Sequence, residues 1–180
     1  MYQDQPADLI ITHGIEIVRE CETSPGETPA WAGHIAGVET PGVVLQALAH
    51  VVKGPWSTVG RPYEVWRHTG LTDAQRQAVA AEARKFLGRH YGWWKLFLQL
   101  GDHHLAWIVH WLTGREGELY AFRRLAFWDK APICNLVWAL AYQRGAGYLF
   151  GEDPFLTSPD DMRDWVLSHV EWEMVDRVEA

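Results

Sequence analysis

Short apolar segments separated by turn residues occupy the first third of the chain, and longer segments with helical spacing follow. Asp8–Thr12 and His34–Glu39 have the composition of strands, and Val43–Leu48 follows after Thr40-Pro41-Gly42. Proline presets the first position of such a turn and glycine tolerates positive φ, so residues 34–48 are expected to form a hairpin. Strands followed by helices predict an α+β domain, in which a small antiparallel sheet packs against helices.

Two further segments are expected to be extended. Ile15–Val18 alternates between apolar and charged residues in its first positions, which favours a second strand or extended segment. Tyr63–Arg67 is expected to be another extended segment. Between the first two strands, residues 22–30 contain Ser24-Pro25-Gly26 and Pro29, which predict a loop.

The strongest helical signal begins at Thr72. Thr72 and Gln75 have the spacing of a capping box, in which the hydroxyl and the amide satisfy free backbone donors at a helix start. Apolar residues from Val79 to Leu87 then fall on one helical face, and Gly88 is a favourable stop. These signals predict a helix over residues 73–87.

Two more helices are expected near the C-terminus. Residues 134–144 have apolar side chains at helical spacing, and Gly145 and Gly147 are expected to end that helix. Ser158-Pro159 followed by two aspartates has the pattern of another helix start, with a capping hydroxyl, proline at the first position and acids in the first turn.

The apolar stretch Tyr91–Thr113 is expected to be helical over residues 92–112. Lys95, Asp102 and two histidines interrupt it, so it is too polar for a membrane span and is expected to be a buried or interfacial helix. Residues 114–131 are mixed and are expected to form a loop with a short helix. Contact with a membrane surface therefore stays open, while a transmembrane segment is not expected.

Length and charge narrow the functional classes. The chain has 180 residues, 48% of them hydrophobic and 22% charged, which fits one globular domain with a sizeable core. The net charge is −7, and the nearest approach to a basic run is the pair Arg123 and Arg124. Nucleic-acid binding is therefore not expected, because it usually requires clustered Lys and Arg. The polar start of the chain lacks the pattern of a secretion signal, which favours a cytoplasmic location.

Cysteine and tryptophan are the informative residue types. Two cysteines, Cys21 and Cys134, are too few for a disulfide scaffold. Free thiols in a reducing compartment are the simpler interpretation, and a single Cys21–Cys134 bridge stays open. The eleven tryptophans are explained either by ordinary packing or by an aromatic groove for an extended or lipidic ligand.

Cys134 is the candidate nucleophile because it opens an apolar helix. Unpaired backbone N–H groups and the positive helix end favour the thiolate, so the thiol pKa is expected to fall. The same N–H groups could hold an oxyanion during acyl transfer. The alternative is a small buried apolar residue, which is the usual role of a lone cysteine.

His34 is the candidate base, since an imidazole can take the thiol proton and later protonate the leaving group. In the expected hairpin, Gln46 lies on the neighbouring strand, where its amide oxygen could accept the second imidazole N–H and fix the tautomer. Glu39 and His50 are nearby alternatives for this third position. An ordinary strand-edge histidine and a polar strand face remain the alternative interpretation.

A metal site is the weaker possibility. His103 and His110 lie seven residues apart on one helical face, with His104 beside them, but at about 1.5 Å rise per residue the two are too far apart for one zinc ion. The sequence has no HExxH pattern, GxSxG elbow, glycine-rich phosphate loop or CxxC pair. We therefore expect neither a metal nor another cofactor.

Four segments resemble those of a known family: Ala7–Ile11, Ala32–Val38, Gly70–Tyr91 and Ile133–Val137. In order, they are similar to an opening Gly-Asp-Ile-Ile strand, a Ser-His-Val-Gly-Ile strand, a linking helix with a Gly-x-x-Tyr end, and a Cys-Ser-Glu-Leu-Val helix. This order resembles the circularly permuted papain-like hydrolases of the YiiX-like branch of the NlpC-type superfamily. The resemblance spans roughly residues 7–145.

The resemblance implies one permuted papain-like domain over residues 1–180, with Cys134 as nucleophile and the histidine before it in the chain. It places Tyr91 near the cleft, where the phenol would contact substrate or the thiolate. Gln46 stands where the family often has glutamate, and Asn135-Leu136 replaces Ser-Glu after the cysteine. Residues 97–130 are expected to be a helical insertion rich in Trp and His.

The expected function is that of a cysteine hydrolase or acyltransferase. Its substrate would contain an amide bond, as in a cell-wall-type peptide, or an acyl bond in a lipid, and the tryptophan-rich middle favours an apolar acyl group. The alternative is a binding module that keeps the papain-like fold without catalysis. The sequence does not predict the oligomeric state.

Overall fold

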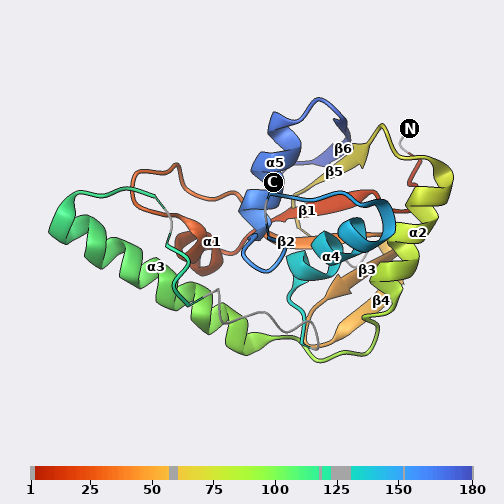
Figure 1. Ribbon diagram of the computed structural model, residues 1–180. Helices are drawn as coiled ribbons and strands as arrows, with labels where there is room; N and C mark the ends of the chain where they lie inside the picture. Colours follow the sequence, from red (N-terminus) through yellow and green to blue (C-terminus); the bar gives the residue numbers. More distant parts are fainter. Residues whose placement is uncertain (1–2, 57–60, 118, 123–130, 152, 180) are drawn as a thin grey trace.

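The computed structural model describes residues 3–56, 61–117, 119–122, 131–151 and 153–179. Within these ranges the order of elements is β1 (Leu9–His13), α1 (Glu16–Glu22), β2 (Ala32–Thr40), β3 (Val43–Ala47), β4 (Val51–Pro55), β5 (Tyr63–His68), α2 (Asp73–Arg84), α3 (Trp93–Thr113), α4 (Cys134–Ala146), α5 (Pro159–Ser168) and β6 (Trp172–Val178). The strands form one antiparallel sheet with the order β4-β3-β2-β1-β5-β6 (Figure 1). The expected α+β class with helices against a small antiparallel sheet is confirmed.

Helix α4 lies against the face of the sheet formed by β2 and β3 (Figure 1). Every residue from Cys134 to Tyr142 is buried, because the sheet, α2 and α5 surround this helix. An apolar helix with no polar face requires such a position. Trp138 packs directly over Gly37 of β2, where an added Cβ would lie 2.5 Å from the indole ring, and its Nε1 donates to the Leu45 carbonyl at 3.2 Å.

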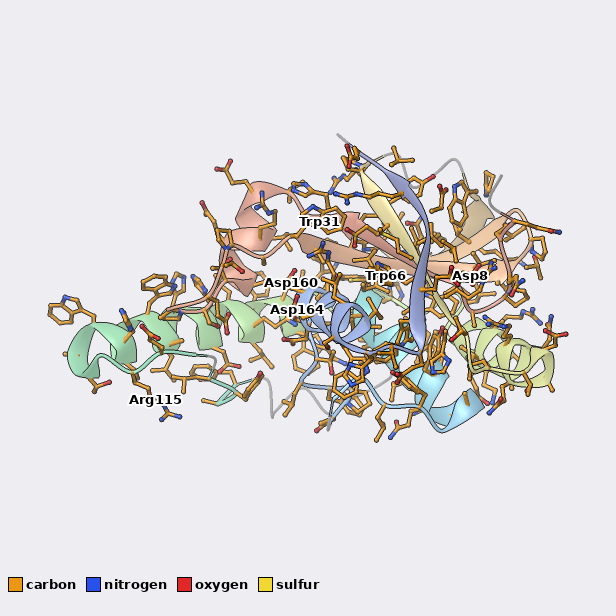
Figure 2. The ribbon with its side chains drawn as sticks, turned by 90° about the horizontal axis from the view of Figure 1, so that it is seen from above. Asp8, Trp31, Trp66, Arg115, Asp160 and Asp164 are labelled. Carbon is orange, nitrogen blue, oxygen red and sulfur yellow. The ribbon has the colours of Figure 1, made fainter. Side chains whose placement is uncertain are left out.

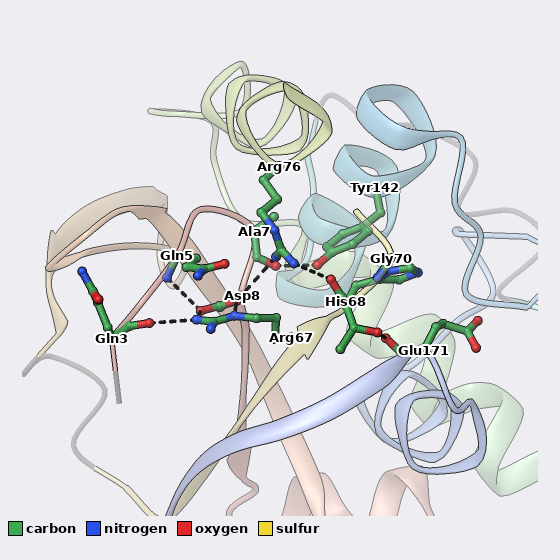
Figure 3. A network of polar contacts seen from close by, with 11 residues as sticks. Gln3, Gln5, Ala7, Asp8, Arg67, His68, Gly70, Arg76, Tyr142 and Glu171 are labelled. Atoms are coloured by element: carbon green, nitrogen blue, oxygen red, sulfur yellow. Dashed lines mark hydrogen bonds and ion pairs between the residues drawn. The ribbon is translucent and has the colours of Figure 1, made fainter. Parts of the chain in front are cut away.

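A buried ion pair fixes the start of β1. Asp8 has no exposed surface, and its carboxylate accepts two hydrogen bonds from Arg67 of β5 at 2.8 and 2.6 Å. Arg76 of α2 also reaches this region and donates to the His68 carbonyl at 2.5 Å, while the Tyr142 hydroxyl of α4 donates to the Ala7 carbonyl (Figure 3). These contacts connect the first strand with the two helices that cover the sheet.

Most of the expected elements are present. The hairpin of β2 and β3 pairs Ala36 with Gln46, and the Thr72 and Gln75 side chains form the expected capping box at α2. Helix α3 covers the expected segment, and Ser158 caps α5. Helix α4 continues past Gly145 and ends at Gly147, whose φ of 69° is left-handed.

The expectation of an extended segment at Ile15–Val18 is wrong, because Glu16–Glu22 forms α1. Four alternating residues are too few to specify a strand. Here Ile15 has extended backbone geometry and its carbonyl accepts hydrogen bonds from the N–H groups of Val18 and Arg19, which starts the helix. The Arg19 Nε donates to the Ala30 carbonyl at 2.5 Å and holds the following loop against the helix.

Sequence reasoning missed the two edge strands. β4 contains Lys53, Gly54 and Pro55, and β6 mixes charged and apolar residues from Trp172 to Val178 without regular alternation. Charges and proline are common on edge strands because they discourage pairing with another chain, and they also weaken the strand signal.

Residues 114–131 were expected to form a loop with a short helix. Part of this segment, including Arg123 and Arg124, lies outside the described residues. The described residues 114–117 and 119–122 contain no helix.

We expect Gly145→Ala to lower the free energy of unfolding by about 1–3 kcal/mol, the usual cost of overpacking. The added Cβ would lie 2.5 Å from the backbone nitrogen of Val79, where α4 crosses α2, and a backbone atom cannot rotate away. Urea denaturation measures the change. Gly70→Ala is the matched control, since its Cβ would meet only the His68 side chain at 3.2 Å. Equal stability of the two variants would contradict this account of the helix crossing.

Candidate active site

The β2–β3 hairpin brings His34 and Gln46 together. Gln46 lies opposite Ala36, and His34 lies two residues before Ala36 on the same face, so the two side chains form a diagonal cross-strand pair. The His34 Nε2 and the Gln46 Oε1 are 3.3 Å apart. Because an amide oxygen only accepts, this contact requires Nε2 to carry the proton and leaves Nδ1 as the acceptor. The expected pairing of these two residues is confirmed.

Cys134 is held at the start of α4 by a close approach of two backbone segments. The Gly92 N–H donates to the Pro132 carbonyl at 3.0 Å, just before the helix begins. An added Cβ at Gly92 would lie 2.3 Å from the Ala131 carbonyl oxygen, so only glycine fits there. This contact places Tyr91 beside the thiol, and its hydroxyl donates to the Cys134 Sγ at 3.9 Å.

The thiol is a free cysteine, which excludes the Cys21–Cys134 bridge in this structure. Its Sγ also lies 4.0 Å from the Asn135 Oδ1, and the backbone amides of Ile35, Asn135 and Cys134 itself act on it. Each amide stabilises negative charge on sulfur. The sulfur therefore faces a group of polar donors within an otherwise apolar region.

Burial nevertheless dominates the ionisation of Cys134. The residue is only 3% exposed, and loss of hydration raises the pKa of the thiol despite the opposing amides of Ile35 and Asn135 and the hydroxyl of Tyr91. The expectation that the position at the helix start lowers this pKa is therefore wrong. The helix end and the amides still favour the thiolate, but the charged form would lose most of its hydration here, and that penalty is larger.

The backbone of β2 links the two parts of the candidate site, Cys134 on α4 and His34 on β2. The amide of Ile35 acts on the Cys134 thiol, and Ile35 follows His34 directly in the strand. Among the residues that the structure describes, the hydrogen-bonding partners of this thiol are Tyr91, Asn135 and backbone amides, and the His34 ring is not one of them. The sulfur and the imidazole are thus attached to adjoining elements without being hydrogen-bonded to each other.

His34 is neutral near physiological pH. Burial lowers the pKa of its imidazole to about 4, Gln46 opposes this effect as a hydrogen-bond acceptor, and the positive charge of Arg61 adds to it. Tyr91 is also neutral, because burial and the neighbouring Cys134 raise the pKa of its phenol. The resting arrangement therefore contains a neutral thiol, a neutral imidazole and a phenol that donates to sulfur.

The alternative site residues have other roles. Glu39 accepts from the Arg84 Nε and lies 3.7 Å from the Lys53 Nζ, so it stabilises the β2–β3 hairpin against α2. The His50 ring lies against the His90 ring, with centroids 4.5 Å apart. Neither replaces Gln46 as the described partner of His34.

Two contributions to the site had weak sequence signals. Asn135 is buried beside the thiol, and its Nδ2 donates to the Thr157 carbonyl, which secures the first turn of α4. Its position directly after Cys134 was the available signal. The amide of Ile35 could not be identified, because a backbone group leaves no mark in the sequence.

The three histidines of α3 do not form a metal centre. The Nδ1 of His110 lies 3.1 Å from the Arg115 carbonyl, and His103 packs edge-on against His104 with centroids 5.5 Å apart. Within the described part of the chain, no three His, Cys, Asp or Glu side chains are grouped so that they could hold a metal ion.

Comparison with known proteins shows the fold. No protein-family model matches the chain, and no curated protein matches its sequence. The crystal structure of YiiX from Escherichia coli O157:H7 is similar, with a TM-score of 0.63 and 16% identity over 98% of this chain and 99% of that chain. The protein therefore has a YiiX-like fold. YiiX is described as a metalloprotein.

We expect acid to destabilise the protein partly through His34. The folded state holds this imidazole neutral down to about pH 4, whereas the unfolded chain takes up a proton near pH 6.5. The stabilising contribution is therefore complete above pH 6.5 and is lost as the pH falls toward 4. Between pH 7 and 4.5, the wild type should lose about 2 kcal/mol more unfolding free energy than His34→Gln.

Urea denaturation at the two pH values measures this difference. His104→Gln is the matched control, because the His104 side chain is exposed on α3. It should retain the acid sensitivity of the wild type. If His34→Gln retained it equally, the imidazole would not be the buried neutral group described above.

Proposed function

We propose that this protein is a cysteine hydrolase or acyltransferase with a permuted papain-like arrangement, in which Cys134 is the nucleophile, His34 the base and Gln46 the group that orients His34. The supporting observations are two contacts: the Tyr91 hydroxyl donates to the Cys134 sulfur at 3.9 Å, and Gln46 holds the Nε2 of His34 at 3.3 Å. Ile35, the residue after His34, lies in the same buried cluster as Cys134. A thiol, a neutral imidazole and a tautomer-fixing acceptor are the parts that thiol-based acyl transfer requires.

The proposed reaction begins when the Nδ1 of His34 takes the thiol proton. The Cys134 sulfur then attacks the carbonyl carbon of an amide or ester, and the carbonyl oxygen becomes negative. Backbone amides at the start of α4 stabilise this oxygen. The imidazolium returns the proton to the leaving amine or alcohol as the bond breaks. Water, or another nucleophile in an acyltransferase, then releases the acyl group from sulfur.

The resting charges determine when the thiol becomes reactive. Burial favours the neutral forms of both Cys134 and His34, so the ion pair does not form in advance. Proton transfer requires the two side chains to approach within hydrogen-bonding distance, and such contacts often tighten only in the substrate complex. Tyr91 supports this step because its hydroxyl already donates to the sulfur and would stabilise the thiolate.

Gln46 makes this site weaker than one with a carboxylate. Its neutral amide orients the imidazole but stabilises imidazolium less than a glutamate would. Both substrate classes, a cell-wall-type peptide amide and a lipid acyl bond, remain within this chemistry. Parallel assays with amide and ester substrates separate them.

The second candidate function is binding without catalysis. It is favoured by one observation, the low exposure of Cys134 together with the raised pKa of its thiol. A cysteine of this kind is ordinarily an inert core residue. The variants described next distinguish the two functions, because a binding module would bind ligand without forming an acyl-cysteine.

We expect Cys134→Ala to lower kcat/KM for activated esters and anilides by at least about a thousandfold, since removal of the nucleophile removes the covalent route. His34→Gln should lower it by about a hundredfold or more. Mass spectrometry of the intact protein, followed by peptide mapping, should locate a trapped acyl group on Cys134. The matched control is Cys21→Ala, which removes the other cysteine and should leave both rate and adduct unchanged.

Two results would contradict the enzymatic proposal. One is an acyl adduct on Cys21 that persists in Cys134→Ala. The other is the complete lack of an adduct together with stoichiometric, reversible ligand binding, which would establish the second candidate function. Thermal unfolding of each variant separates a lost reaction from a lost fold.

We expect Gln46→Glu to raise the pKa of His34, because a carboxylate beside Nε2 stabilises the imidazolium. The acid limb of the kcat/KM profile should move to higher pH, and NMR titration of the His34 ring should show the same shift. Gln46→Met, which has similar length but only a weakly accepting sulfur, should instead lower activity without moving the limb upward. An unchanged His34 titration in Gln46→Glu would show that the side chain at position 46 does not interact with the imidazole.

A further inference from the structure

Helix α3 has its polar and apolar sides reversed relative to an ordinary surface helix. The buried residues of this helix are Lys95, Gln99, Asp102 and Ala106. Its large exposed apolar residues are Trp93, Trp94, Phe97, Trp107, Ile108, Trp111 and Leu112, with Phe97 72% and Trp111 83% exposed. We call these seven residues the apolar face of α3. Soluble surface helices normally bury such residues, so we expect this face to bind a partner.

Contacts on the inner side fix this orientation. The Asp102 Oδ1 accepts a hydrogen bond from the Phe122 N–H at 2.7 Å, and the Lys95 Nζ lies 5.6 Å from the centre of the Phe155 ring. Rotation of the helix to hide its tryptophans would break these contacts and place Lys95 and Asp102 in solvent. The apolar face is therefore presented outward by the fold.

The position of α3 leaves this face accessible. The helix extends away from the body formed by the sheet, α2 and α4 (Figure 1), and the second view shows the same projection, with Arg115 on the segment that follows the helix (Figure 2). From Trp93 to Trp111 the apolar face runs about 27 Å along the helix axis, at about 1.5 Å per residue. This is a long, narrow surface on a projecting element.

The chemistry of the face indicates a lipid surface. The exposed positions of α3 carry aromatic and aliphatic side chains, with His104 and Thr113 as the polar members, and none of them is Asp, Glu, Lys or Arg. Tryptophan is enriched at membrane–water interfaces because its ring is apolar with one polar edge. No helix in the described residues is long and apolar enough to cross a membrane, so α3 would lie along the surface.

The charge of the protein indicates which lipid headgroups α3 would contact. A polybasic segment is the usual means of binding anionic lipids, whereas none of the exposed residues of α3 is Lys or Arg and the chain has a net charge of −7. An anionic surface would therefore repel the protein. We propose that α3 docks the protein onto a zwitterionic phospholipid bilayer, with its tryptophans at the level of the headgroups.

A cavity adjoins the inner end of this face. It has a volume of about 270 Å³ and lies between α1 and α3, and its lining includes Trp93, Phe97 and Glu22. Docking itself does not rest on the proposed catalysis.

Flotation of the full-length protein with phosphatidylcholine vesicles tests the proposal. The wild type should float with the vesicles, and the double variant Phe97→Ser/Trp111→Ser should partition at least about tenfold less, because two large apolar side chains no longer enter the interface. Replacing about 30% of the lipid with phosphatidylserine should weaken wild-type binding at low salt. The matched control is Leu167→Ser/Val170→Ser, which removes two exposed apolar side chains outside α3 and should float like the wild type.

Three results would overturn the proposal. They are a wild type that does not float, a Phe97→Ser/Trp111→Ser variant that floats equally, and binding that occurs only with anionic lipid. A dimer in analytical ultracentrifugation that dissociates in this variant, without flotation, would assign the face to a second copy of the chain. Cys134→Ala should float normally, so failure of docking and failure of the proposed chemistry are distinguishable.

Discussion

The burial of α4 against β2 and β3 is the interaction on which the rest of the structure depends. Trp138 rests on Gly37, which has no side chain to keep the helix away, and the close crossing at Gly145 fixes α2 on the other side. The start of α4 is then determined as well, because the helix axis leads directly to Cys134 beside the backbone of Ile35. The position of the thiol is a consequence of core packing, so the candidate site and the fold cannot be varied independently.

The same packing sets the electrostatics of the candidate site. Exclusion of water raises the pKa of the Cys134 thiol and lowers that of the His34 imidazole, so both groups become neutral. A neutral pair is less reactive at rest than a thiolate–imidazolium pair, but it costs less to bury. Polar contacts from Tyr91, Asn135 and backbone amides only partly offset this burial. Reactivity in such a site has to be generated by the approach of the two side chains, rather than stored in a charged ground state.

Sequence reasoning succeeded where local chemistry determines structure. The turn at Pro41-Gly42 and the pattern around it gave the hairpin, and the hairpin in turn gave the His34–Gln46 contact, because strand register follows from turn geometry. It failed where tertiary context decides. The ionisation of Cys134 depends on how deeply α4 is covered, which no local pattern encodes, and α1 begins within Ile15–Val18, a segment that resembles a strand. The two edge strands were not predicted because charged residues, glycine and proline interrupt their apolar residues.

Helix α3 shows another limit of structure prediction from sequence patterns. Its sequence predicts a buried or interfacial helix, and in a helix with two unlike sides the polar residues Lys95, Gln99 and Asp102 would ordinarily mark the solvent side. The fold instead uses that polar stripe as the internal contact, since Asp102 has a backbone donor from Phe122 and Lys95 has an aromatic neighbour in Phe155. Periodicity establishes that a helix has two unlike sides, but only the partners available to the polar side decide which one faces inward. Where the protein itself satisfies the polar side, the apolar side is left for a surface that contains no water, and a bilayer provides such a surface.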